Sequence, residues 1–183
     1  MRLRECFDKH GCDRGLRHGY ETVYEPLFEQ FRLEPLRILE IGIFRGAGIW
    51  TWLDYFPNAE VFGIDTFQRI APERIEVLKH ERVKYWRADS TTMEGDDLPE
   101  WMYHRFDIII DDGDHKAISQ LRTFENFFPA LKSDGMYFIE DVWPDSKQLR
   151  KPGYFELIDS LPETAIHHDL RKGRAVDSYL IQC

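Results

Sequence analysis

The sequence has few cysteines, no long hydrophobic run and no surplus of positive charge. Its three cysteines, Cys6, Cys12 and Cys183, form no CxxC pair and imply no disulfide framework. No stretch approaches the roughly 20 apolar residues of a membrane span, and the N-terminus lacks an apolar core of signal-peptide length. Lysine and arginine number 24 against 33 acidic residues, and this net charge of −9 argues against nucleic acid and anionic membranes as partners. We therefore expect a reduced, cytoplasmic protein.

A group of metal-binding residue types lies near the start of the sequence: Cys6, His10, Cys12 and His18. Their spacing matches none of the common zinc sites. The simpler interpretation is a surface segment that happens to hold these residues.

The 183 residues suit a single domain, with a short helical lead-in over 1–35 and a core over 36–183. Short β-like runs alternate with helical ones, which is typical of an α/β sheet with parallel strands. The link LRKGRA between the last two runs is too short for a parallel crossover, so an antiparallel hairpin is expected there. We predict a Rossmann-like three-layer sandwich, with a seven-stranded, mostly parallel sheet and an antiparallel C-terminal strand. The predicted strands are 36–41, 61–64, 83–87, 106–110, 135–139, 164–169 and 176–182.

The clearest helical pattern covers residues 116–131, where apolar residues follow helical spacing. Asp114 is predicted to cap its start, and Pro129 to kink or end it near Phe128. Another helix should follow the first predicted strand. Its packed face is expected to hold three aromatic residues: Trp50, Trp52 and Tyr55.

A glycine-rich turn follows the first predicted strand, in ILEIGIFRGAG at 38–48. The spacing of Gly42, Gly46 and Gly48 is not the GxGxxG of dinucleotide-binding proteins, which place a pyrophosphate on a helix N-terminus. With Glu40 before it, this looser loop fits a nucleoside ligand without a pyrophosphate at the carboxyl end of the strand.

Acidic residues also end the next two predicted strands. Asp65 follows Gly42 by about 20 residues, near the spacing at which an acid binds ribose hydroxyls. Asp89 ends the third strand, where its carboxylate could accept a hydrogen bond from the exocyclic amine of adenine. The alternative for both residues is a solvated acid at a strand end.

Carboxylates gather where the fourth and fifth predicted strands end, in DIIIDDGDH and GMYFIEDVW. One strand–helix–strand crossover separates Asp112 from Glu140 and Asp141, so the three can meet at the carboxyl edge of adjacent strands. Such carboxylates repel one another unless a cation lies between them, and all-oxygen ligation favours Mg²⁺, with Mn²⁺ as a substitute. His115 is placed for general-base work beside this site. The alternatives are mutually screened surface acids and a histidine that only caps the helix.

These stretches together resemble a known family. LEIGIFRGAG, FGIDTF, FDIIIDDGDH, FFPALKSDGMYFIEDVW and HHDLRKGRA…YLI are similar to class I S-adenosylmethionine-dependent methyltransferases. More closely, they resemble the metal-dependent sugar O-methyltransferases of the mycinamicin 2''-O-methyltransferase-like group. The resemblance covers most of the chain, from about residue 8 to 181. It implies S-adenosylmethionine and Mg²⁺ (or Mn²⁺) as cofactors, and a small-molecule hydroxyl acceptor, a sugar or vicinal diol.

The resemblance also implies roles for particular residues. His115 would be the catalytic base, and the metal ligands would be Asp112, Glu140 and Asp141. Asp114 stands where family members often have serine and adds a negative charge near the site. The residues expected to bind the cofactor are Glu40, Gly42, Gly46, Asp65, Thr66, Asp89, Ser90 and Asp111.

Two further parts of the chain are expected to contribute to the pocket. Residues 143–147, with Trp143 as a stacking surface, could line the acceptor site, and His18 and Tyr20 could close over the cofactor. The macrolide enzymes have a longer N-terminal region than this chain. A partner subunit could therefore supply a lid here, as part of a homo-oligomer.

Three other functions are alternatives. A catechol-type O-methyltransferase acting on a small aromatic diol would use the same metal chemistry. An NAD-dependent nucleotide-sugar enzyme is disfavoured because the sequence has neither GxGxxG nor a Tyr-x-x-x-Lys pair. A non-catalytic cofactor-binding subunit is disfavoured because it has no need of the acid–histidine set.

Overall fold

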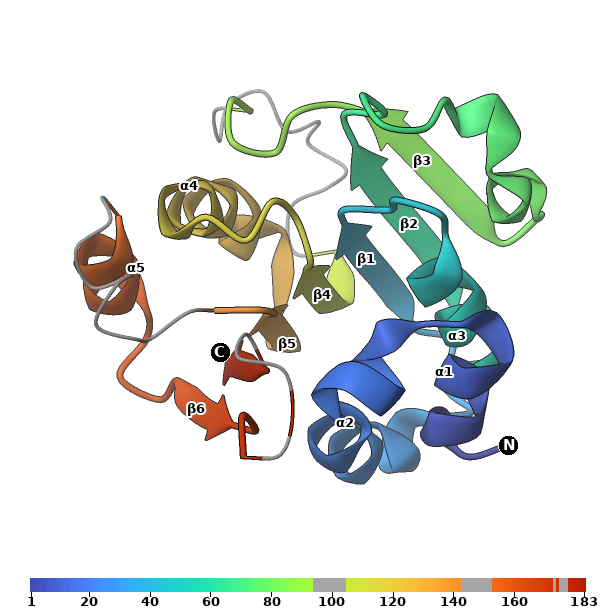
Figure 1. The fold of residues 1–183 in the computed structure, drawn as a ribbon, viewed down its shortest axis with the longest axis horizontal. Helices are drawn as coiled ribbons and strands as arrows, with labels where there is room; N and C mark the ends of the chain where they lie inside the picture. Colours follow the sequence, from blue (N-terminus) through green and yellow to red (C-terminus); the bar gives the residue numbers. More distant parts are fainter. Residues whose placement is uncertain (94–104, 143–152, 173, 175–177) are drawn as a thin grey trace.

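The computed structural model describes residues 1–93, 105–142, 153–172, 174 and 178–183 (Figure 1). Its seven strands form one sheet in the order β3–β2–β1–β4–β5–β7–β6. β1 to β5 are parallel, whereas β7 runs antiparallel to β5 and β6. The predicted fold class, including the antiparallel C-terminal hairpin, is confirmed. The strands are β1 (Arg37–Ile41), β2 (Glu60–Asp65), β3 (Val83–Arg87), β4 (Phe106–Asp111), β5 (Leu131–Ile139), β6 (Ile166–Asp169) and β7 (Tyr179–Gln182).

The helices of the described residues connect these strands and form the lead-in. The α-helices are α1 (Leu3–His10), α2 (Glu21–Phe28), α3 (Ala47–Tyr55), α4 (Ala117–Phe127) and α5 (Tyr154–Ser160). Shorter turns are the π-helix Arg14–His18 and the 3-10 segments Glu29–Phe31, Pro72–Arg74, Glu76–Lys79 and Phe128–Ala130.

Most predicted boundaries agree with the structure to within two residues. The predicted start of the last strand, at 176, lies outside the described residues. Two other features differ. The fifth strand starts at Leu131 rather than at 135, because the chain pairs with Phe106 directly after the preceding turn. Helix α4 ends at Phe127 as Pro129 predicts, but its N-cap is Lys116, without a side-chain cap. The Asp114 carboxylate instead accepts a hydrogen bond from the Lys116 N–H at 3.1 Å. The prediction that Asp114 caps the helix is therefore wrong.

Two hydrophobic cores lie on opposite faces of the sheet, because successive strand residues point to opposite sides. Ile38 packs with the lead-in and α3, whereas its neighbour Leu39 packs with α4 and α5. Figure 1 shows this arrangement, with α1, α2 and α3 on one side of the strands and α4 and α5 on the other. Trp52 and Tyr55 are fully buried on α3, which confirms the predicted packed face.

The lead-in is part of the core rather than a surface segment. Cys6, Cys12 and His18 are buried, and both cysteines are free thiols. The expectation that this segment lies on the surface is wrong, because α1 and α2 cover the sheet face beside α3. None of the helices in the described part of the chain is both long and apolar enough to cross a bilayer.

Candidate active site at the carboxyl edge of the sheet

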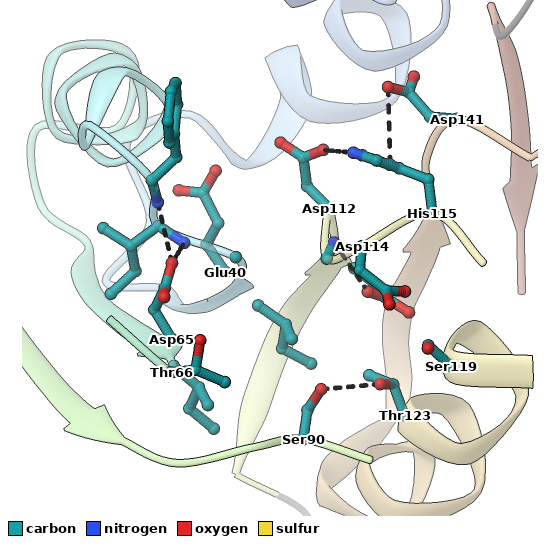
Figure 2. A pocket seen from close by; sticks show the side chains of 18 of the residues that line it. Glu40, Asp65, Thr66, Ser90, Asp112, Asp114, His115, Ser119, Thr123 and Asp141 are labelled. Atoms are coloured by element: carbon teal, nitrogen blue, oxygen red, sulfur yellow. Dashed lines mark hydrogen bonds and ion pairs between the residues drawn. The ribbon is translucent and has the colours of Figure 1, made fainter. Parts of the chain in front are cut away.

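A cavity of about 750 Å³ opens at the carboxyl ends of β1 to β4. Its volume lies within the roughly 300–1,000 Å³ range of small-molecule and cofactor sites. Figure 2 shows four of the predicted acids around it: Glu40, Asp65, Asp112 and Asp141. Seven of the eight residues predicted to bind the cofactor line its wall: Glu40, Gly42, Asp65, Thr66, Asp89, Ser90 and Asp111. Gly46 does not line it, although its neighbours Arg45 and Ala47 do.

Backbone strain is concentrated at the same edge. Four non-glycine residues of the described chain have positive φ: Phe44, Phe67, His115 and Asp141. They follow β1, β2, β4 and β5, respectively. Such conformations cost about 1–3 kcal/mol each and persist where the surrounding structure enforces them, commonly at functional sites.

The glycine loop is shaped by close backbone approach. Gly42 has φ +93°, and a Cβ placed on it would lie 2.1 Å from the backbone oxygen of Asp112. Only glycine fits here, because the loop after β1 passes directly against the segment after β4. Gly46, with φ +81°, forms the N-cap of α3.

Asp65 fixes this loop from the end of β2. Its Oδ2 accepts hydrogen bonds from the N–H groups of Ile43 and Phe44, at 2.9 and 3.0 Å. Its Oδ1 accepts from the N–H of Phe67 at 2.6 Å. The carboxylate thus has a structural role in the loop besides its place on the cavity wall. Oδ1, which accepts a single hydrogen bond, retains a further lone pair for a ribose hydroxyl.

The ends of β3 and β4 supply the next part of the wall. Asp89 Oδ1 accepts from the backbone N–H and the hydroxyl of Thr91. Ser90 Oγ is 2.8 Å from the hydroxyl of Thr123 on α4 (Figure 2). Sequence reasoning did not identify Thr123, Ser119 and Gln120, since inward-facing polar residues of a helix carry no strand-end signal.

Asp111 is the most enclosed acid of the cavity wall. It is 1% exposed, its Oδ1 accepts from the N–H of Gly113 at 3.2 Å, and its Oδ2 has no hydrogen-bond partner. Burial raises the pKa of this carboxyl to about 8. An unpaired buried oxygen on the cavity wall is a group that a ligand donor would satisfy.

Asp112, His115 and Asp141 converge beside the cavity (Figure 2). One ligand atom from each lies within 4.8 Å of the others. His115 Nε2 is 3.9 Å from Asp112 Oδ1, and its Nδ1 is 3.7 Å from Asp141 Oδ2. Ligands on opposite sides of Mg²⁺ lie about 4.2 Å apart, so this group fits a small divalent cation after minor side-chain adjustment.

Glu140 points away from that group. Arg14 Nε donates to both of its oxygens at 2.8 and 2.7 Å, and the Tyr24 hydroxyl donates to its Oε1. Burial raises the pKa of Glu140 to about 7, although Arg14 and Tyr24 oppose the rise. Two of the three predicted metal residues are therefore brought together with His115, while Glu140 binds Arg14 and Tyr24, and Arg14 in turn contacts Asp112.

Glu40 belongs to both the cavity and the cluster around Arg14. It is 2% exposed, and its Oε1 is 2.9 Å from Arg14 Nη2. Its Oε2 is buried without a hydrogen-bond partner. Burial raises the pKa of the Glu40 carboxyl, while the Arg14 guanidinium and the Trp52 indole oppose the rise.

Two residues of the lead-in, His18 and Tyr20, contact the site, but at a different place from the predicted one over the cofactor. The Tyr20 hydroxyl donates to Asp141 Oδ1 at 2.6 Å, and His18 Nδ1 is 3.4 Å from the same oxygen. Both residues therefore contact the proposed metal side rather than cover the cofactor cavity. Arg14, the central cation of the site, was missed because nothing in the lead-in sequence links it to the strand ends. Residues 143–147, predicted to line the acceptor site, lie outside the described residues.

Comparisons with known proteins agree with this architecture. The methyltransferase domain family matches residues 39–142, more than half of the chain. The chain is 33% identical over 145 residues to 8-demethyl-8-(2-methoxy-alpha-L-rhamnosyl)-tetracenomycin-C 3'-O-methyltransferase of Streptomyces olivaceus, covering 74% of this chain and 35% of that protein. It is 28% identical over 136 residues to mycinamicin VI 2''-O-methyltransferase of Micromonospora griseorubida, covering 70% and 33%.

A solved structure shares the fold over the whole chain. The MycE methyltransferase in complex with Mg, SAH and mycinamycin VI superposes with a TM-score of 0.75 at 20% identity, covering 100% of this chain and 54% of that one. The chain spans about a third of the length of the two curated relatives above. It belongs to the S-adenosylmethionine-dependent methyltransferase family and is related, at modest identity, to sugar O-methyltransferases of natural-product pathways.

Proposed function

We propose that this chain is the catalytic domain of an O-methyltransferase that transfers the methyl group of S-adenosylmethionine to a sugar hydroxyl. The observation that carries the proposal is the convergence of Asp112, His115 and Asp141 at a cavity that the glycine loop lines. The tetracenomycin and mycinamicin relatives, both named for O-methylation of glycosylated natural products, support a sugar acceptor over a catechol.

The cofactor would occupy the cavity between the ends of β1 and β4. The Glu40 carboxylate would accept from its ammonium group, and Asp65 Oδ1 from its ribose hydroxyls. Asp89 and Ser90 would lie at its adenine end. The loop around Gly42 allows the ligand to approach the backbone closely.

A divalent cation would be held by the carboxylates of Asp112 and Asp141. When bound, it fixes a neighbouring hydroxyl and lowers the pKa of that hydroxyl. Mg²⁺ and Mn²⁺ prefer oxygen ligands, which leaves the His115 imidazole free to act beside them. Glu140 remains a predicted ligand, although its oxygens accept hydrogen bonds from Arg14 and Tyr24.

His115 would take the proton of the acceptor hydroxyl as the oxygen attacks the methyl carbon. The carbon–sulfur bond breaks in line, and the leaving group is neutral S-adenosylhomocysteine. Asp112 and Asp141 flank the imidazole at 3.9 and 3.7 Å, and both would stabilise the imidazolium that forms. Much of the remaining acceleration would come from positioning the two reactants.

Calorimetric titration tests the proposal. The protein should bind S-adenosylmethionine, and the complex with S-adenosylhomocysteine should then bind Mg²⁺. Asp112→Asn should weaken Mg²⁺ binding by more than the roughly 10–100-fold that changes around a metal's ligands produce. Asp114→Asn is the matched control, since this exposed carboxylate pairs with Lys116 and is not part of the group of Asp112, His115 and Asp141.

Each outcome bears on a different part of the proposal. Loss of Mg²⁺ binding in Asp112→Asn but not in Asp114→Asn supports the metal site. Cofactor binding without any Mg²⁺ binding would retain the methyltransferase and reject the metal. A protein that binds neither ligand would contradict the proposal as a whole.

A further inference from the structure

Arg14 lies at the centre of the site although it comes from the lead-in. It begins the π-helix between α1 and α2, and only 3% of its surface is exposed. Its guanidinium lies over the Trp52 ring, 5.6 Å from the ring centroid, and its Nη1 is 3.6 Å from Cys12 Sγ. Short π-helical segments occur frequently at functional sites.

This guanidinium joins the ends of three strands. Nη2 is 2.9 Å from Glu40 Oε1, after β1, and 2.7 Å from Asp112 Oδ2, after β4. Nε contacts both oxygens of Glu140, after β5. One planar group thereby bridges a carboxylate of the cofactor cavity and a carboxylate of the proposed metal group. The geometry of an arginine fork is rigid, so the two carboxylates hold fixed positions relative to each other.

Helix α3 packs closely against the Glu40–Arg14 contact on one side. A Cβ placed on Gly48 of α3 would lie 2.1 Å from Glu40 Oε1 and 2.3 Å from Arg14 Nη1. Helix α3 therefore presses against the Glu40–Arg14 pair. The pair is confined between this helix and the strand ends.

We propose that Arg14 is a positioning residue that couples cofactor binding to metal binding. It holds the carboxylate of Glu40, a residue of the cavity wall, and through the same nitrogen it sets the position of Asp112. Occupation of one site then pre-orders a carboxylate of the other site. This inference rests on the proposed function. It adds Arg14, a residue of the lead-in, as a contact shared by the cofactor site and the metal site.

The test measures the coupling directly. The Kd of S-adenosylhomocysteine is measured by calorimetry with and without saturating Mg²⁺, for the wild type and for Arg14→Lys. The wild type should bind more tightly with Mg²⁺ by about 5-fold or more, which is the lower end of typical coupling between sites. Arg14→Lys keeps the charge but lacks the fork, and its two Kd values should agree within about twofold.

A second variant separates position from charge. Arg14→Met combined with Glu140→Gln removes one positive and one negative charge, so the net charge of the cluster is unchanged. Coupling should be lost in this double variant relative to Glu140→Gln alone. Arg82→Lys is the control for stability, because Arg82 donates to the backbone carbonyls of Leu53, Phe56 and Ala59 and does not line the cavity.

The outcomes separate this inference from the proposed function. A wild type that binds neither ligand would overturn both. A wild type that binds both ligands without coupling, or an Arg14→Lys variant with wild-type coupling, would overturn only the role of Arg14. If both Arg14 variants fail to fold by circular dichroism, Arg14 acts in stability alone and the inference is rejected.

Discussion

Replacing Gly42 by alanine should lower the free energy of unfolding by at least about 3 kcal/mol and abolish cofactor binding. The added Cβ would lie 2.1 Å from the backbone oxygen of Asp112 and 2.7 Å from its carbonyl carbon. It would also sit on a residue with φ +93°. Because both contacts are to backbone, relief requires the ends of β1 and β4 to move apart, which opens the wall of the cavity.

Gly11→Ala is the matched control for backbone strain. Gly11 also has a positive φ, +64°, but a Cβ added there would have nothing within 4 Å of it. The substitution should lower the free energy of unfolding by only the roughly 1–2 kcal/mol of a left-handed residue. Gly11 itself lines the cavity, so the comparison between the two variants is one of stability. Chemical denaturation and titration of S-adenosylhomocysteine measure both effects. Equal losses of stability in the two variants would contradict the close approach at Gly42.

The sequence was sufficient to predict the sheet and the residues at its carboxyl edge. Strands such as β4 contain runs of buried β-branched residues, and in a parallel sheet their carboxyl ends meet. Asp65, Asp112 and Asp141 therefore lie near the cavity as their positions in the sequence indicate. This part of the site could be predicted because the hydrophobic pattern of the sequence indicates where the strands end.

The direction of each side chain at that edge could not be read from the sequence. Glu140 and Asp141 are neighbours, and their side chains point to different partners, Glu140 to Arg14 and Asp141 to His115. Asp141 also has φ +54°, which removes the regular alternation of a strand. A predicted set of three metal carboxylates did not account for this divergence.

Arg14 illustrates a second limit. A buried charge needs partners, and its three carboxylates come from segments up to 126 residues away. Hydrophobic periodicity reports which faces are buried but not which distant charges meet there. The sequence predicted a divalent cation among the acids at the strand ends, and it did not include the Arg14 guanidinium that lies against three of them.

Replacing His115 should reduce methyl transfer by about 10²–10⁴-fold, which is the usual contribution of a general base. Asparagine is the better substitution, because His115 has φ +57° and asparagine tolerates this conformation better than alanine does. The measurement is kcat with radiolabelled S-adenosylmethionine, on the glycoside that the wild type methylates. The affinity for S-adenosylhomocysteine should stay within about twofold, since the imidazole is not needed to hold the cofactor.

The Mg²⁺ affinity of the same variant decides between two roles for the imidazole. A ring nitrogen of His115 lies close enough to Asp112 and Asp141 to act either as a metal ligand or as a base. A nitrogen that ligates a metal has no lone pair left to accept a proton, so the two roles exclude each other at that atom. Unchanged Mg²⁺ affinity with a large loss of kcat supports the base. A loss of Mg²⁺ affinity as large as that of Asp112→Asn would make His115 a ligand, and the proton would then have to leave through another group.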